Sequence, residues 1–230
     1  MKADFRYNDN ITNFVFIGEA GCGKSEIAIN LAYNLAKEGK KPVHFFDLDM
    51  TKPLFRSRDK AKPMEDAGII VHFEEQFYDA PTLVGGVRPI MLDQSCYVIL
   101  DIGGDYIGAR AIGGFAPLIN RDNTAVYYIV NSYRPWSATI DHIDGVLSQV
   151  LGVSHIQLAK LRFIGNPNLG VSTTAEDVLK GIEDTKAILE DIVPIDFFCA
   201  KRQIAQALPD SIKIYPVDLH LTYFWEEDPA

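Results

Sequence analysis

The sequence is short of cysteine and of long apolar runs. Its three cysteines, Cys22, Cys96 and Cys199, contain no C-x-x-C pair. They therefore indicate neither a disulfide framework nor a self-contained zinc site, and a reducing compartment suits them. The N-terminus has no apolar stretch typical of a secretory signal, and no run approaches the roughly 18 apolar residues that span a bilayer. We expect a cytoplasmic protein that does not enter a membrane.

The sequence also lacks an excess of positive charge. Asp and Glu number 31 against 22 Lys and Arg, which gives a net charge of −9. Negative charge is repelled by the phosphate backbone of nucleic acid and by the headgroups of anionic lipids. The composition therefore argues against nucleic acid as a partner.

Apolar runs rich in β-branched residues alternate with helical patterns along the chain. This alternation predicts an α/β fold, with a doubly wound, mostly parallel sheet and helices on both faces, in a single domain over residues 1–230. A segment at about 50–95 has several prolines and little periodicity, and we expect irregular switch or partner-facing structure there. The expected strands are Asn13–Ile17, Val43–Phe46, Ile69–Phe73, Tyr97–Leu100, Ala125–Val130, Leu161–Ile164 and Ile195–Phe198, and the expected helices are one that ends at Gly39 and those at Trp136–Leu151 and Ala175–Ile192.

A phosphate-binding motif follows the first expected strand. Glycines let the backbone adopt positive φ, so that its N–H groups can curl around an anion. The motif's lysine reaches the β- and γ-phosphates, and its hydroxyl residue ligates Mg²⁺. The pattern G-x-x-x-x-G-K-[ST] is matched by the consecutive residues Gly18, Glu19, Ala20, Gly21, Cys22, Gly23, Lys24 and Ser25. We predict that these residues bind a nucleoside triphosphate, with Lys24 acting on its phosphates.

A second magnesium ligand is expected at the end of an apolar strand. Asp101 follows the run Tyr97–Leu100, and Gly104 comes three positions later. A carboxylate in this place is typical of the Walker-B element that helps to hold Mg²⁺ in P-loop proteins. We therefore assign Asp101 to the metal with Ser25, and we expect the N–H of Gly104 to face the γ-phosphate.

Together these motifs resemble the deviant-Walker-A branch of P-loop ATPases, which contains the MinD and ParA partitioning ATPases and the nitrogenase iron protein. In that family the second strand ends in an acidic pair about 25 residues beyond the P-loop lysine, where this sequence has Asp47 and Asp49. The resemblance implies that Asp49 orients the attacking water and that Asp47 lies beside it, at the metal.

The resemblance also suggests which base is bound. The run Arg162–Asn166 is similar to the family's strand that ends in a base-reading asparagine, which implies that Asn166 contacts adenine. An amide suits this role because it donates and accepts hydrogen bonds at the base edge together. No [NT]-K-x-D motif for reading guanine is present, so ATP is favoured over GTP.

One position departs from the family. The signature lysine, which commonly reaches the partner's phosphates in a dimer that sandwiches ATP, is replaced by Glu19. We expect either that this carboxylate opposes such a homodimer or that it turns away and accepts a cation from the other chain. A Glu19→Lys variant should, on the first alternative, dimerise more strongly with ATP.

Three functions remain open at this point. The leading one is a Mg²⁺-dependent ATPase switch that controls a partner protein by hydrolysing ATP. The second is a nucleotide-sensing module with little turnover, because Glu19 removes the family's lysine. The third is a small-molecule kinase, with the segment at about 50–95 as a lid over the acceptor.

Overall fold

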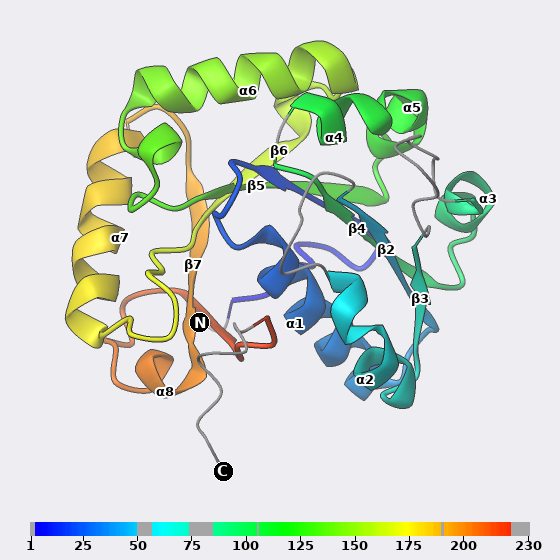
Figure 1. The fold of residues 1–230 in the computed structure, drawn as a ribbon, viewed down its shortest axis with the longest axis horizontal. Helices are drawn as coiled ribbons and strands as arrows, with labels where there is room; N and C mark the ends of the chain where they lie inside the picture. The colour runs from blue at the N-terminus through cyan, green and yellow to red at the C-terminus, as the bar shows by residue number, and fades with distance from the viewer. Residues whose placement is uncertain (1–2, 50–56, 74–84, 105, 190, 222–230) are drawn as a thin grey trace.

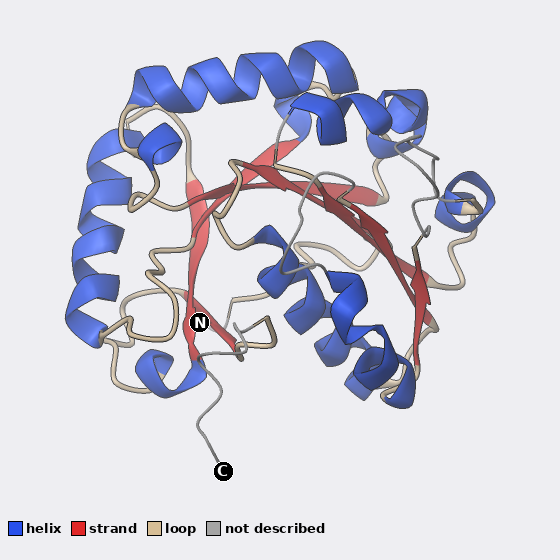
Figure 2. Cartoon of the chain, viewed as in Figure 1, coloured by secondary structure: helices blue, strands red, loops and turns tan. Residues whose placement is uncertain are grey.

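Eight parallel strands form one sheet at the centre of the molecule. The computed structural model describes residues 3–49, 57–73, 85–104, 106–189 and 191–221. Within these residues the strand order is β3-β2-β4-β1-β5-β6-β7-β8, and all neighbours are parallel. Figures 1 and 2 show helices on both faces of this twisted sheet. The predicted α/β fold class is confirmed.

Every predicted strand is present, and most are longer than predicted. Their bounds are β1 Asn13–Gly18, β2 Val43–Leu48, β3 Ile69–His72, β4 Tyr97–Ile102, β5 Thr124–Val130, β6 Leu161–Gly165 and β7 Ile195–Lys201. The sequence did not indicate β8, Ile214–Val217, because this strand is short and contains Pro216. A proline fits there because β8 lies at the edge of the sheet, where not every backbone N–H must pair with a neighbouring strand.

Two long helices each have one end at the residue that the sequence predicts. The helix α1, Lys24–Glu38, ends at Gly39, whose φ of 64° is the left-handed conformation expected of a C-terminal glycine. The helix α7, Ala175–Leu189, starts where predicted but ends before the expected Ile192. The N–H groups of Ile192 and Val193 both donate to the carbonyl of Leu189, in a turn that follows the helix.

The start of the third long helix differs from the prediction. We expected a helix from Trp136, but Pro135–Ser137 form a separate 3₁₀ turn, η3, and α6 is Ile140–Ser154. Thr139 defines the new start, because its side chain accepts a hydrogen bond from the N–H of His142. This turn lies beside the phosphate-binding loop.

The segment at about 50–95 is less irregular than predicted in its described part. It contains the 3₁₀ turn η1 Ser57–Lys60, the helices α2 Ala61–Asp66 and α3 Val87–Leu92, and the edge strand β3. Residues 50–56 and 74–84 lie outside the described residues. The other short elements are α4 Tyr106–Ala111, η2 Gly113–Phe115, α5 Ala116–Ile119, η4 Leu158–Lys160 and α8 Arg202–Ala205.

The alternation of side chains along the strands makes two apolar layers. In β1, Phe14 and Phe16 point to the face that α1 covers, and Val15 and Ile17 point to the face that α4, α5 and α6 cover. All four side chains are buried. Apolar groups buried on both faces of a parallel sheet fix its register and hold the carboxyl ends of β1, β2 and β4 in place.

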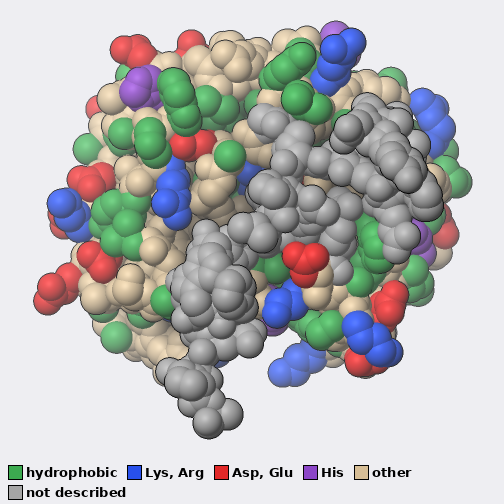
Figure 3. Space-filling model, in the orientation of Figure 1, with side chains coloured by type: hydrophobic (Ala, Val, Ile, Leu, Met, Phe, Trp, Pro, Cys, Tyr) green, Lys and Arg blue, Asp and Glu red, His purple; other side chains and the backbone are tan. Residues whose placement is uncertain are grey.

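The described surface carries charges of both signs. On the face drawn in Figure 3, Lys and Arg side chains lie among Asp and Glu side chains over most of the described elements. The excess of negative charge in the composition is therefore not gathered into one patch on that face.

Candidate functional site

The phosphate-binding loop joins the end of β1 to the start of α1. Gly18, Gly21 and Gly23 all have positive φ, at 141°, 74° and 99°. A Cβ atom built on Gly23 would lie 2.2 Å from the side-chain nitrogen of Asn166, and one on Gly18 would lie 2.6 Å from a backbone oxygen of β5. Glycine is therefore required both by the backbone conformation and by the close packing of the loop.

Lys24 is held inside this loop. Its side chain is 1% exposed, and Nζ donates to the carbonyl oxygens of Gly18 at 3.1 Å and Glu19 at 2.8 Å. The ammonium group therefore lies across the loop rather than on the surface. Replacing Lys24 would remove support from two loop carbonyls as well as a charge.

The acidic residues at the ends of β2 and β4 lie side by side. Asp47 pairs in register with Asp101, and both are fully buried. The backbone N–H of Asp49 donates to Asp47 Oδ1 at 3.0 Å, and Ser57 Oγ donates to Asp101 Oδ2 at 2.8 Å. The structure thus brings together the three predicted carboxylates and adds Ser57. No motif in the sequence marked this serine.

The segment after Asp101 touches both the P-loop and Asp49. A Cβ atom on Gly104 would lie 2.6 Å from Ala20 Cα and 2.7 Å from Lys24 Nζ. One on Gly103 would lie 3.1 Å from Asp49 Oδ1. The backbone contact at 2.6 Å requires glycine at position 104, and the approach of the Gly104 N–H to a γ-phosphate stays a prediction.

The donor atoms at this edge suit a hard cation. Ser25 is buried in the first turn of α1 and offers a hydroxyl oxygen, while Asp47 and Asp101 offer carboxylate oxygens. Mg²⁺ prefers such oxygen ligands and usually keeps water and phosphate oxygens in its shell. Among the described residues, no group of three or more His, Cys, Asp and Glu side chains could hold a metal ion. The hydroxyl oxygen of Ser25 and the carboxylate oxygens of Asp47 and Asp101 are the kind of ligand that Mg²⁺ takes together with phosphate oxygens.

Glu19 turns away from the phosphate-binding side of the loop and into its own chain. Its carboxylate accepts hydrogen bonds from the backbone N–H of Trp136 at 3.1 Å and from Ser137 Oγ at 2.7 Å. The side chain is 4% exposed. The groups that bond to this carboxylate belong to the η3 turn of the same chain, and not to a cation of another chain as the second alternative expected. The sequence could not show that contact, since residues 19 and 137 are far apart along it. Whether the carboxylate opposes a homodimer stays a prediction.

Two further side chains support the loop from the same edge of the sheet. Asn166, at the end of β6, donates through Nδ2 to the carbonyl of Cys22 at 2.8 Å. Arg134, after β5, donates through Nε to the carbonyl of Gly21 at 3.0 Å. The sequence predicted Asn166 as an adenine contact, which stays a prediction, and did not indicate this support of the loop. Arg134 was missed because no motif contains it.

A cavity of about 690 Å³ opens beside the loop. Ala20 and Gly104 form one wall, and residues of η3 and α6 form the other. Tyr106 and Trp136 stand at it with about half of their surface exposed, at 49% and 58%. This volume lies within the range of small-molecule sites.

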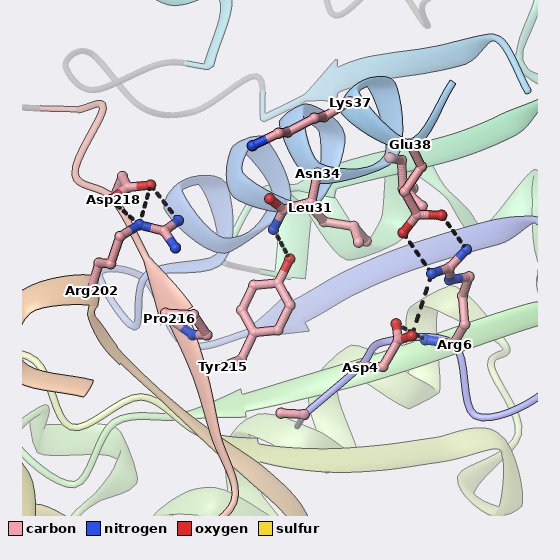
Figure 4. Close-up of a pocket in the computed structure, with 12 residues that line it drawn as sticks. Asp4, Arg6, Leu31, Asn34, Lys37, Glu38, Arg202, Tyr215, Pro216 and Asp218 are labelled. Atoms are coloured by element: carbon pink, nitrogen blue, oxygen red, sulfur yellow. Dashed lines mark hydrogen bonds and ion pairs between the residues drawn. The ribbon is translucent and has the colours of Figure 1, made fainter. Parts of the chain in front are cut away.

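A second cavity, of about 780 Å³, lies away from the P-loop, beside the later part of α1 and β8 (Figure 4). Its ionic groups neutralise one another. Arg6 donates to both carboxylate oxygens of Glu38, at 2.7 and 2.8 Å, and Arg202 binds Asp218. These pairs give the cavity no surplus charge of the kind that the P-loop lysine provides.

The start of α1 also anchors the end of the described chain. Glu26 is 9% exposed, and its carboxylate accepts backbone hydrogen bonds from His220 and from Leu221, the latter at 3.1 Å. Burial raises the pKa of Glu26 to about 7, although these two hydrogen bonds oppose the shift. The helix that carries Lys24 and Ser25 therefore holds an acid that titrates near neutral pH.

The parallel sheet, the loop between β1 and α1 and the acidic ends of β2 and β4 define a P-loop nucleotide-binding protein. Residues 14–193 match the family described as the CobQ/CobB/MinD/ParA nucleotide binding domain (CbiA). The chain belongs to this family and contains its nucleotide-binding domain.

Solved structures share the fold. The signal recognition particle 54 kDa protein from Aeropyrum pernix, solved in complex with GDP, is 17% identical with a TM-score of 0.50, over 84% of this chain and 42% of that chain. Chloroplast FtsY from Physcomitrella patens is 15% identical with a TM-score of 0.51, over 86% and 62%. FtsY from Mycoplasma mycoides is 14% identical with a TM-score of 0.52, over 87% and 65%.

The chain therefore spans between 42% and 65% of the length of these three proteins, and the likeness concerns the fold alone. A comparison with curated protein sequences found no match. Within the residues that the structure describes, no helix is both long enough and apolar enough to cross a membrane.

Proposed function

We propose that this protein is a Mg²⁺-dependent ATPase switch of the MinD/ParA type, which binds and hydrolyses ATP to control a partner protein. The observation that carries the proposal is the meeting of three segments at one edge of the sheet. Gly104 approaches Lys24 and Ala20, and Gly103 approaches Asp49. Segments in such contact with a phosphate-binding loop can be ordered by a γ-phosphate and released when it leaves.

The chain's own residues would divide the chemistry. Lys24 would contact the β- and γ-phosphates, and Asp49 would orient the attacking water. Ser25 and Asp101, with Asp47 beside them, would hold Mg²⁺, whose charge neutralises the phosphates. Catalysis of this kind rests on positioning and charge neutralisation.

The sequence after β6 supports ATP over GTP. Pro167 follows Asn166, so the lysine of an [NT]-K-x-D motif is missing. The GTPase-like neighbours share only the fold, at 14–17% identity. Adenine would be read by Asn166, whose position at the P-loop is compatible with a base next to it.

Glu19 favours a second candidate, a nucleotide-sensing module with little turnover. Its carboxylate is engaged by Trp136 and Ser137, so this position supplies no cation to a partner's phosphates. Cations supplied in trans accelerate related reactions by roughly 10³–10⁵-fold. A protein that lacks such a cation would bind ATP and hydrolyse it slowly. This would hold for a monomer and for a homodimer in the cytoplasm.

The cavity beside Ala20 and Gly104 favours a third candidate, a small-molecule kinase. An acceptor bound there would lie next to the γ-phosphate end of the loop. The same cavity, with Tyr106 and Trp136 exposed at it, also suits a side chain of a protein partner, which would then sense the nucleotide directly.

The test is to titrate ATP and GTP into the purified protein by calorimetry, with Mg²⁺ and with EDTA, and to follow phosphate release at several protein concentrations. A switch should bind ATP with Mg²⁺ and hydrolyse it above background. Tight ATP binding without turnover would support the nucleotide-sensing module. Transfer of labelled phosphate to a metabolite would support the small-molecule kinase. Absence of ATP binding would refute the proposal.

A further inference from the structure

Arg134 is a basic residue beside the P-loop that no motif assigns. It follows β5, the strand next to β1, at the carboxyl ends where ligands bind in open parallel sheets. Its Nε donates to the carbonyl of Gly21 at 3.0 Å, and its side chain is half-buried. Among the described residues, no hydrogen bond or ion pair engages its two terminal amino groups. The guanidinium group at the loop therefore keeps the four N–H donors of its two terminal nitrogens.

The contact with Gly21 fixes the side of the loop on which Arg134 lies. In a trans peptide the carbonyl and the N–H point in opposite directions, and carbonyl oxygens do not face phosphates because both are negative. The Gly21 carbonyl, and the Arg134 side chain bonded to it, therefore lie opposite the N–H of that peptide. Lys24 Nζ donates instead to the carbonyls of Gly18 and Glu19, at the start of the loop.

Asn166 lies on the next carbonyl of the same loop, that of Cys22, at 2.8 Å. Gly21 and Cys22 are consecutive residues, so Nε of Arg134 and Nδ2 of Asn166 bond to neighbouring carbonyls of the loop. A purine held by Asn166 would therefore lie within reach of the guanidinium group. Such a group is planar, and it stacks on aromatic rings with its donors directed outward.

We propose that Arg134 contacts the base and ribose of the bound nucleotide, with its guanidinium plane against the base. This inference rests on the proposed nucleotide site and names a residue that deepens it. Stacking on a ring face does not depend on the groups at the base edge. Arg134 therefore strengthens binding of ATP and GTP alike, while Asn166 distinguishes between them.

The experiment compares Arg134→Ala, Arg134→Lys and Asn166→Ala with wild type. Affinities for ATP, GTP and inorganic tripolyphosphate, which has no base, are measured by calorimetry and by competition against a fluorescent ATP analogue. Arg134→Ala should bind ATP and GTP about 5- to 30-fold more weakly, as cation–π contacts predict. Its affinity for tripolyphosphate should stay within about twofold of wild type. Arg134→Lys should recover less than half of the loss, and Asn166→Ala should change the ATP-to-GTP ratio.

Arg121→Ala is the matched control, because Arg121 is an exposed arginine before the other end of β5. It should bind all three ligands as wild type does. An equal loss of tripolyphosphate and ATP in Arg134→Ala would show a phosphate contact or a collapsed loop, and would overturn the inference. Unchanged ATP affinity would overturn it too. If wild type itself bound none of the three ligands, the proposed function would fail instead.

Discussion

Glu19 offers the sharpest test of how the P-loop is held. Its carboxylate accepts from the Trp136 N–H and from Ser137 Oγ, and both Glu19 and Ser137 are buried. Hydrogen bonds to a charged acceptor contribute about 1.5–3 kcal/mol each. Glu19→Ala should therefore lower the free energy of unfolding by about 3–5 kcal/mol, a large part of the 5–15 kcal/mol typical of a domain.

Two further variants, Glu19→Gln and Glu19→Lys, separate the effect of side-chain shape from that of charge. A glutamine keeps one acceptor for the Trp136 N–H and gains an amide donor that Ser137 Oγ can accept. Glu19→Gln should therefore cost less than Glu19→Ala, about 1–3 kcal/mol, since both hydrogen bonds are kept but both become neutral. Glu19→Lys should cost at least as much as Glu19→Ala, because it places an ammonium group against two donors and away from water.

The assay is urea unfolding without nucleotide, followed by circular dichroism. Glu183→Lys, an exposed substitution on α7, is the control and should change stability by no more than about 0.5 kcal/mol. Sedimentation velocity with a non-hydrolysable ATP analogue tests whether Glu19 opposes an ATP-dependent dimer. A Glu19→Lys protein that is as stable as wild type and gains such a dimer would refute a structural role for this carboxylate.

The remaining predictions concern the phosphate site and pH. Lys24→Ala should abolish measurable ATP binding and, because Lys24 is buried and bonded to two carbonyls, should also lower the unfolding midpoint in urea. Asp49→Asn should retain ATP in calorimetry but suppress phosphate release, whereas Asp101→Asn should weaken the Mg²⁺ dependence of binding; identical behaviour of the two would contradict separate roles. Glu26 has a folded pKa of about 7 against an ordinary value of 4.5, so the folded state binds the extra proton between these values and stability should fall by up to about 3 kcal/mol as pH rises from 4.5 to 7. Glu26→Gln should flatten this part of the pH profile in urea unfolding while the exposed Glu65→Gln leaves it unchanged, and a wild-type profile that rises there would show the sign to be wrong.

The sequence predicted those parts of the fold whose signals are local. Apolar runs located β1 to β7, and Gly39 located the end of α1, because burial and backbone conformation act within a few residues. The strand β8 escaped because it has four residues and a proline. The start of α6 was misplaced because Pro135–Ser137 resemble a helical start, while the cap at Thr139 decides where the helix begins.

The residues of the candidate site differ in the same way: some lie in local motifs, and others reach the site from distant parts of the sequence. The P-loop and Asp101 are recognisable because their spacing is set by one strand and one turn. Ser57 and Arg134 were missed because each reaches the site across the sheet, through contacts with Asp101 and Gly21. Partners so distant in sequence leave no periodic signal, and an unaligned sequence holds no other record of them.

Glu19 joins the two kinds of information. Its place in the motif is visible in the sequence, but its contacts are made with the η3 turn. Arg134, which also contacts the P-loop, is the residue just before this turn. The P-loop is thus tied to the start of α6 twice, by the Glu19 carboxylate and by the Gly21 carbonyl. A movement of the loop on binding phosphate would have to move this turn or break both contacts. If the protein is a switch, we therefore expect η3 and the first turn of α6, beside the cavity with the exposed Trp136, to respond to nucleotide together with the Asp49 and Asp101 segments.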